Sequence, residues 1–169
     1  MIGIDKVTVN IGVGGSGEKL EKAKKLLEKI TKQKPVETKS KKRIPTWDIR
    51  KKMPIGVKVT LRGKKAEDFL DKCFNAIDRE LYIKSFSDEN FSFGIKEYIN
   101  IPEFKYDAEI GIFGFDVCVT MKKWGSRIKK RKRKKRGIPL RHLIKKEDTI
   151  SFLKERFNVK IVEKKEERW

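Results

Sequence analysis

The chain has 169 residues, which suits one domain with a hydrophobic core of its own. It carries 44 Lys and Arg against 24 Asp and Glu, a net charge of +20, while 37% of its residues are hydrophobic. This composition excludes a chain that is disordered throughout, and its positive charge favours polyanionic partners.

The first predicted strand covers residues 4–11, IDKVTVNI, because apolar and polar side chains alternate along it. Its polar side chains are Lys6, Thr8 and Asn10. A glycine-rich stretch, GVGGSG, follows at 12–17. Residues 18–31 then repeat apolar side chains at helical spacing, with Ser16 as the expected N-cap. Residues 35–38 predict a short strand.

Residues 39–54, KSKKRIPTWDIRKKMP, contain seven cations and two prolines and show neither helical nor strand periodicity. We expect a long, exposed basic loop, and loops of this length are usually functional or disordered. Trp47 in this loop has two interpretations. The commoner one is an anchor on a small apolar cluster, and the other is a ring that stacks on a base or ribose.

The second half of the chain repeats these patterns. Residues 55–62 alternate and predict a strand. The polar side chains of this strand are Lys58, Thr60 and Arg62. Residues 64–77 predict an amphipathic helix, and both cysteines, Cys73 and Cys118, are expected to be buried. The other predicted elements are an irregular stretch at 79–90, strands at 91–99 and 113–121, a helix at 146–157 and an edge strand at 159–162.

Most of these strands alternate, rather than being apolar throughout, which favours antiparallel pairing with one polar face. The predicted fold class is therefore α+β, a mainly antiparallel sheet with helices packed on one face as a two-layer sandwich. We expect residues 1–169 to form a single domain. Two basic segments interrupt it, the loop at 39–54 and an excursion at 122–145.

Residues 127–136, RIKKRKRKKR, have nine cationic side chains out of ten. A solvated charge block or a localisation tag is one interpretation. The run lies between a predicted strand and a predicted helix, however, so it is held near the folded body. Contact with phosphates would release condensed counterions, which favours the interpretation as a nucleic-acid contact.

The outward rows of the two alternating strands leave two alternatives open. They form either an ordinary solvated sheet face or a surface whose hydroxyl, amide and guanidinium groups contact bases, sugars and phosphates.

The stretch at 12–17 also fits the G-x-G-x-x-G spacing of a dinucleotide-binding loop, with Glu37 about 20 residues further on. A nucleotide-binding enzyme is therefore an alternative function. The half-polar first strand argues against it, because the corresponding strand of a dinucleotide-binding fold is buried on both faces. His142 is the single histidine, and we expect no catalytic residues, metal or cofactor.

No apolar stretch reaches the roughly 18 residues of a membrane span, and the N-terminus lacks the layout of a signal peptide. We expect a cytoplasmic protein that does not contact a membrane.

Four stretches, at 9–35, 49–71, 91–107 and 114–121, resemble in order the universal family of large-subunit ribosomal protein five. The most specific blocks are IGVKVTLRG and GIKEY followed by PE. The cationic run before a C-terminal helix is similar to the archaeal and eukaryotic branch. The resemblance implies a twisted sheet related to RNA-recognition modules, in a non-catalytic component of the large ribosomal subunit. A non-ribosomal RNA-binding protein is a further alternative.

The resemblance also implies partners. The protein would bind 5S rRNA, attach it to the large-subunit rRNA in the central protuberance, contact P-site tRNA, and lie beside another 5S-binding protein. A small-subunit head protein would complete an intersubunit bridge.

The implied site residues fall into three groups. The residues expected at 5S rRNA are Thr8, Asn10, Gln33, Lys34, Lys58, Thr60 and Arg62. Those of the P-site tRNA loop are Arg43, Thr46, Trp47, Arg50 and Lys51. Those at rRNA phosphates are Arg127, Lys129, Lys130, Arg131, Lys132, Arg133, Lys134, Lys135 and Arg136.

Overall fold

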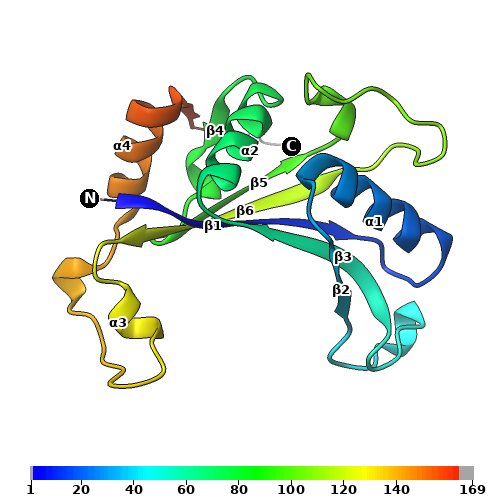
Figure 1. The fold of residues 1–169 in the computed structure, drawn as a ribbon, viewed down its shortest axis with the longest axis horizontal. Helices are drawn as coiled ribbons and strands as arrows, with labels where there is room; N and C mark the ends of the chain where they lie inside the picture. The colour runs from blue at the N-terminus through cyan, green and yellow to red at the C-terminus, as the bar shows by residue number, and fades with distance from the viewer. Residues whose placement is uncertain (1, 164–169) are drawn as a thin grey trace, which may run out of the picture.

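Five antiparallel strands form the central sheet of the computed structural model, which describes residues 2–163 (Figure 1). The strands are β1 (Ile2–Gly12), β2 (Val36–Lys39), β3 (Pro54–Leu61), β5 (Asn90–Ile95) and β6 (Phe115–Lys123). The helices are α1 (Glu18–Thr31), α2 (Lys64–Asn75), α3 (Arg127–Lys130) and α4 (Lys146–Phe157). The strand order is β2-β3-β1-β6-β5, so β1 lies in the middle of the sheet.

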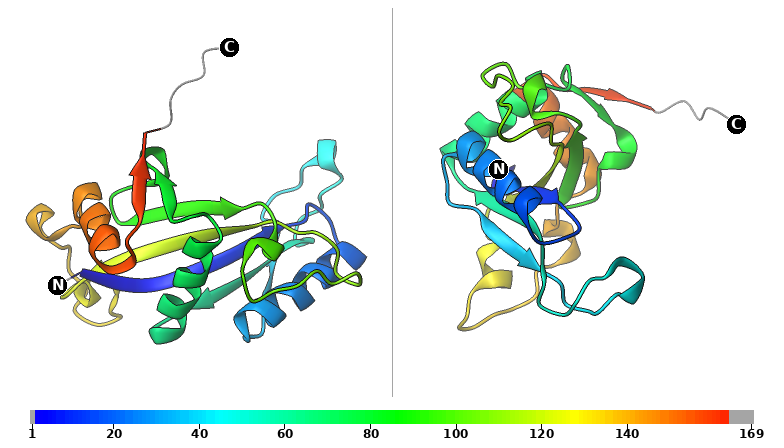
Figure 2. Two further views of the ribbon diagram at one scale, coloured as in Figure 1. Left: turned by 90° about the horizontal axis from the view of Figure 1, so that it is seen from above. Right: turned by 90° about the vertical axis from the view of Figure 1, so that its right-hand side faces the viewer.

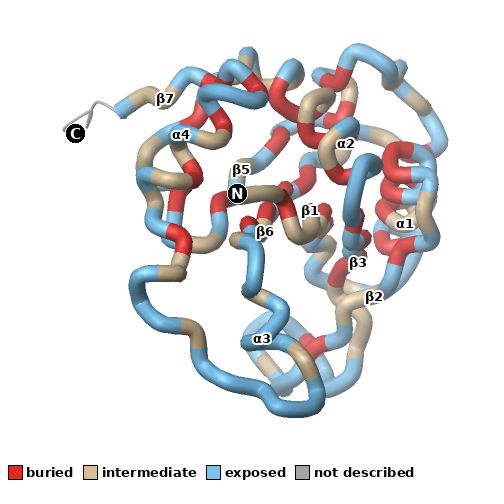
Figure 3. The backbone as a smooth tube through the Cα atoms, turned by 60° about the vertical axis from the view of Figure 1, so that its left-hand side comes forward, coloured by how far each residue is buried: buried red, intermediate tan, exposed pale blue. Residues whose placement is uncertain are grey.

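One face of the sheet carries the core. The inward side chains of β1, Val7, Val9 and Ile11, are at most 2% exposed. The helices α1, α2 and α4 pack over this face, and Figure 3 shows buried residues along the strands and along the inner sides of these helices. The predicted α+β class, with helices on one face of a mainly antiparallel sheet, is confirmed.

A second, smaller sheet lies beside the helices. Its strands β4 (Glu80–Tyr82) and β7 (Lys160–Val162) pair in parallel. The prediction of an irregular stretch at 79–90 was therefore wrong in part. The strand predicted at 159–162 exists but pairs with β4 rather than with the main sheet. Each strand has only three residues, too few to show a period of two.

The start of α1 and the end of β5 also differ from the predictions. Gly17, with φ of 126°, occupies the N-cap position of α1 in place of Ser16, because this backbone conformation suits glycine and turns the chain directly into the helix. The strand predicted at 91–99 ends at Ile95, and a 3-10 turn at Tyr98–Asn100 follows it.

The two basic segments leave the sheet at opposite ends of β1. The loop at 39–54 joins β2 to β3, whose start pairs with Gly12, and the basic excursion follows Lys123, which pairs with Ile2. Figure 1 and the right-hand view of Figure 2 show both segments on the side of the sheet away from α1, α2 and α4. We call the face of the sheet opposite α1, α2 and α4 the open face; the two basic segments, one of which contains the short helix α3, flank it.

Candidate nucleic-acid interface

The centre of the open face is a row of small polar side chains. Thr8 on β1 lies opposite Thr60 on β3 and Cys118 on β6, and Cys118 lies opposite Ser92 on β5. Residues that pair directly in an antiparallel sheet share a face. Three hydroxyls and one thiol therefore cross four neighbouring strands in one line, and each hydroxyl can both donate and accept a hydrogen bond.

A second row runs parallel to the first. Asn10 lies opposite Lys58 on one side and Asp116 on the other, and Asp116 lies opposite Gly94. A carboxylate repels phosphate but accepts hydrogen bonds from a ribose hydroxyl or a base amino group. This row therefore suits contacts to sugars and bases better than contacts to phosphates. A third row holds Lys6, Thr120 and Asn90.

Only half of this face was predicted from the sequence. Alternation placed Thr8, Asn10, Lys58 and Thr60 on one outward surface, and the register brings these four together as predicted. The outward side of β5 and β6 was not considered, although β6 alternates in the same way. The residues missed there are Asn90, Ser92, Asp116, Cys118, Thr120 and Lys122.

Cys118 corrects a second prediction. Cysteine is usually a buried residue, and both cysteines were expected in the core. Cys73 is buried, and burial raises the pKa of its thiol. Cys118 is exposed, because it takes an outward position of β6 between Val117 and Val119. Partial burial, with the nearby Asp116 charge, raises the pKa of the Cys118 thiol.

Asp5 links the open face to the basic excursion. The pairing of β1 with β6 shifts between Ile4 and Lys6, so Asp5 sits at a β-bulge. Its carboxylate lies 2.5 Å from Lys130 Nζ and 3.9 Å from Arg62 Nη1. Burial opposes ionisation of Asp5, but the hydrogen bond and charge of Lys130, with Arg62 adding, hold the pKa of this carboxyl below its usual value.

Gln33 and Lys34 lie elsewhere. Both belong to the connection between α1, which ends at Thr31, and β2, which begins at Val36. They are outside the rows of the open face, next to the edge strand of the sheet. Neither periodicity nor spacing predicted a role for them, and that role stays a prediction from the family resemblance.

The basic loop at 39–54, predicted as a long exposed loop, closes on itself as a hairpin. Ile44 and Ile49 exchange backbone hydrogen bonds of 2.8 and 3.1 Å. The Ser40 amide donates to the carbonyl oxygen of Met53, and the Lys52 amide donates to the carbonyl oxygen of Ser40. Ile49 is buried, whereas Trp47, in the 3-10 turn at the tip, is 70% exposed. Trp47 is therefore not an apolar anchor, since Ile49 fills that position. The other residues that the resemblance places at P-site tRNA, Arg43, Thr46, Arg50 and Lys51, are all exposed.

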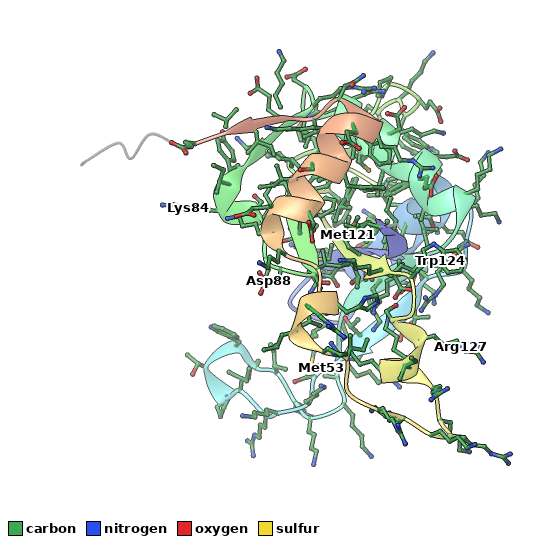
Figure 4. All side chains as sticks on the ribbon, turned by 90° about the vertical axis from the view of Figure 1, so that its left-hand side faces the viewer. Met53, Lys84, Asp88, Met121, Trp124 and Arg127 are labelled. Carbon is green, nitrogen blue, oxygen red and sulfur yellow. The ribbon has the colours of Figure 1, made fainter. Side chains whose placement is uncertain are left out.

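The basic excursion is fastened to the sheet at its beginning. Two lysines of its short helix α3 form ion pairs with acidic residues of the folded body. Lys129 lies 3.4 Å from Glu89, and Lys130 pairs with Asp5. His142 Nε2 donates a hydrogen bond of 2.6 Å to the carbonyl oxygen of Trp124 and closes the segment. Figure 4 shows Arg127 on this segment below the sheet. The cationic side chains beyond α3 are exposed, apart from the half-buried Arg131.

A hollow of about 660 Å³ lies between this segment and the open face. The side chains Lys6, Asn90 and Thr120 contribute from the sheet, and Lys129 and Lys130 from α3. Side chains of the open face and of the basic excursion thus line the same hollow. The two predicted contact surfaces are therefore neighbours in space, although Asp5 of β1 and Lys130 of α3 are 125 residues apart in the chain.

The glycine-rich loop at 12–17 is hydrogen-bonded to the start of β3 and does not have the geometry of a nucleotide-binding loop. The amides of Val13 and Gly14 both donate to the carbonyl oxygen of Ile55, at 3.0 and 2.9 Å, so they do not point at a phosphate. In the sheet β3 separates β1 from β2 and is antiparallel to both. A dinucleotide-binding unit needs adjacent parallel strands at this point. This geometry argues against the enzyme alternative.

Residues 2–163 contain neither a cluster of metal ligands nor a membrane-spanning helix. Within these residues, no three His, Cys, Asp or Glu side chains gather closely enough to hold a metal ion. None of the helices in that part of the chain has the length and apolarity to cross a membrane.

Comparison with known protein families decides the classification. Residues 1–50 match the family described as Ribosomal protein L5, and residues 54–152 match the C-terminus of the same ribosomal family. The chain belongs to the ribosomal L5 family. The resemblance inferred from the sequence is thus confirmed for both parts of the chain.

Individual relatives of the L5 family support this assignment over most of the chain. Large ribosomal subunit protein uL5 of Methanococcus aeolicus is 49% identical over 162 residues, which cover 94% of this chain and 90% of the relative. The uL5 protein of Sulfolobus acidocaldarius is 53% identical over 161 residues, covering 95% and 90%. That of Nanoarchaeum equitans is 49% identical over 162 residues, covering 95% and 96%. All three sources are archaea, so this L5 chain is of the archaeal type.

Proposed function

We propose that this L5-family protein is a structural component of the large ribosomal subunit whose open face binds 5S rRNA. One observation carries the proposal. An uncovered sheet face bears three rows of hydrogen-bonding side chains and lies between two cationic segments. Such a face matches the sugars and base edges of RNA, and the flanking charge matches its phosphates. The mechanism is binding rather than catalysis.

The open face is the proposed 5S rRNA site. Thr8, Asn10, Lys58 and Thr60 lie in its rows, and Arg62 follows at the end of β3. To these the register adds Asn90, Ser92 and Thr120. Gln33 and Lys34 belong to the proposal only through the family resemblance.

The basic segments carry the remaining contacts. We assign residues 127–136 to phosphates of the large-subunit rRNA, which would attach 5S rRNA to the subunit. We assign the exposed tip around Trp47 to P-site tRNA. A second 5S-binding protein and a bridge to a small-subunit head protein follow from the family resemblance alone.

A titration tests the central part of the proposal. The full-length protein is titrated with 5S rRNA and with a shuffled RNA of equal length, at roughly 50 and 200 mM salt. Both RNAs should lose about 10³- to 10⁵-fold in affinity, because phosphate contacts are salt-dependent. At the higher salt 5S rRNA should keep a clear advantage. Equal binding of both RNAs would instead indicate a non-specific RNA-binding protein.

The variant Arg62→Ala tests whether the open face is the site that binds 5S rRNA. Loss of a charged donor at the end of β3 should weaken 5S rRNA binding by about 1.5–3 kcal/mol and leave the shuffled RNA less affected. The matched control is Arg156→Ala, which removes one arginine from α4 on the helix-covered side. If Arg62→Ala weakened both RNAs equally, the assignment of the open face would be wrong.

A further inference from the structure

Trp124 lies where β6 has ended and the basic excursion begins, as its label in Figure 4 shows. This residue is 76% exposed, although a ring of this size is normally buried. Its neighbours along the chain, Lys122, Lys123 and Arg127, are cationic. Neither the core nor the rows of the open face account for an indole ring at this position.

The backbone of Trp124 is held in place. Its carbonyl oxygen accepts the 2.6 Å hydrogen bond from His142. The next residue, Gly125, has φ of 87°, and a Cβ there would lie 3.2 Å from His142 Nε2. This turn therefore needs glycine and keeps the histidine close. A ring on a fixed backbone loses less conformational entropy on binding than a ring on a mobile loop.

Trp124 stands next to the hollow between α3 and the open face. Lys123 and Ser126, on either side of it in the chain, line that hollow, as does His142. At about 660 Å³ the hollow has the size of a small-ligand site. Its lysines are Lys6, Lys122, Lys123, Lys129, Lys130 and Lys135.

We propose that Trp124 and this hollow form a subsite for one unpaired nucleotide of RNA. The indole ring stacks on the base, and the lysines of the hollow contact the phosphates beside it. Stacking on aromatic rings within a cationic groove is how proteins bind single-stranded nucleic acid, and every base offers a face for it. A base within a duplex has both faces covered, so the subsite selects unpaired RNA. The concentration of lysines favours RNA over a protein partner.

The inference rests on the proposed RNA-binding function but is tested separately from it. The chain has three tryptophans, Trp47, Trp124 and Trp169. In the full chain with Trp47→Phe and Trp169→Phe, Trp124 is the only indole fluorophore. An oligoadenylate of about ten nucleotides should quench its emission, whereas the same strand in a duplex should bind through charge with little quenching.

Affinity gives the second measurement. Trp124→Ala should weaken binding of the single-stranded oligoadenylate roughly 5- to 150-fold and leave the duplex unchanged, since stacking on one base has that range. Trp124→Phe should retain most of the affinity. The matched control is Leu140→Ala, which removes an 83% exposed apolar side chain from the same excursion and should have no effect.

Two outcomes would overturn the subsite. One is equal quenching by single strand and duplex, which would mean that only charge is sensed. The other is no change in oligoadenylate affinity on Trp124→Ala, which would assign the ring to another surface. Neither outcome touches the preference for 5S rRNA at high salt, so the proposed function would stand without the subsite.

Discussion

At the scale of single residues, Asp5 shows how acidic side chains organise a protein with a large positive charge. It holds Lys130 and lies near Arg62, so one carboxylate connects a residue of the basic excursion to one at the end of β3. Glu89, directly before β5, pairs with Lys129 at 3.4 Å. These acids hold cationic side chains of the basic excursion next to the sheet.

Asp5 predicts a dependence of stability on pH. Its pKa is lowered in the folded protein, so its contribution is present above its ordinary value of 3.8 and is lost as pH falls through the lower folded value. Asp5→Asn should lower the free energy of unfolding at neutral pH by up to about 1 kcal/mol, because the pair is partly exposed. Urea unfolding of both proteins over acidic and neutral pH measures this.

The stability difference between the wild-type protein and Asp5→Asn at low pH distinguishes two explanations. The two proteins should converge in stability well below the ordinary pKa, where Asp5 is protonated in both folded and unfolded states. A constant difference at every pH would mean that the substitution acts through the bulge geometry and not through the ion pairs.

At the scale of elements, the close approach of β3 to β1 and β2 depends on glycine at position 56. Gly56 in β3 pairs with Gly12 of β1 and with Thr38 of β2. A Cβ at Gly56 would lie 2.7 Å from the carbonyl oxygen of Ile11 and 3.0 Å from Thr38 Oγ1. No real Cβ approaches backbone so closely, so the strands would have to separate.

Gly56→Ala should therefore destabilise the protein by about 1–3 kcal/mol, the usual range for overpacking. Thermal or denaturant unfolding measures the change. Gly15→Ala is the control, because a Cβ there meets nothing within 4 Å. Equal effects of the two substitutions would show that the close approach of β1 and β3 is not the cause.

The basic excursion is a second element with its own prediction. Replacement of Lys132, Arg133, Lys134 and Lys135 by glutamine removes exposed charge and keeps Lys129 and Lys130, which fasten α3. The slope of log affinity against log salt should fall by roughly 0.9 for each phosphate that is no longer neutralised, for any RNA. Binding titrations over a range of salt measure this slope.

The matched control for the excursion removes the same charge from the helix-covered side, at Lys19, Lys25, Lys64 and Lys154. If both quadruple variants reduced the slope equally, net charge rather than the position of the excursion would determine RNA affinity.

At the scale of the whole molecule, the fold separates two tasks. The helices α1, α2 and α4 cover one face of the sheet and pack with it to form the core, and the two basic segments flank the open face on the other side (Figures 1 and 2). Such a concentration of like charge costs stability in the free protein through self-repulsion. Binding to a polyanion removes that cost, and a partner that binds only the folded state stabilises it further.

The sequence predicts the parts of this arrangement that have a local period. Alternation in β1 and β3 predicted the outward polar side chains of these two strands, and those of β6 could have been predicted in the same way. The parallel pair β4–β7 was not, because a strand of three residues has no measurable period. The pairing of Asp5 with Lys130 joins residues far apart in the chain, and no local pattern encodes it. The positions of Gln33 and Lys34 beside the sheet edge likewise emerge only in the folded molecule.

The central claim is that RNA lies on the open face, and Cys118 tests it most directly. Its thiol sits in the middle row between Thr8 and Ser92, while Cys73 is buried and reports any unfolding. Alkylation by a maleimide, followed by mass spectrometry, gives the rate at each thiol. Mildly alkaline buffer compensates for the raised pKa of Cys118.

With saturating 5S rRNA, labelling of Cys118 should slow in proportion to the bound fraction. Cys73 should stay unlabelled throughout, and a shuffled RNA at the higher salt should not protect Cys118. If Cys118 in the saturated complex reacted as fast as in the free protein, RNA would not lie on the open face, and the basic segments alone would hold it.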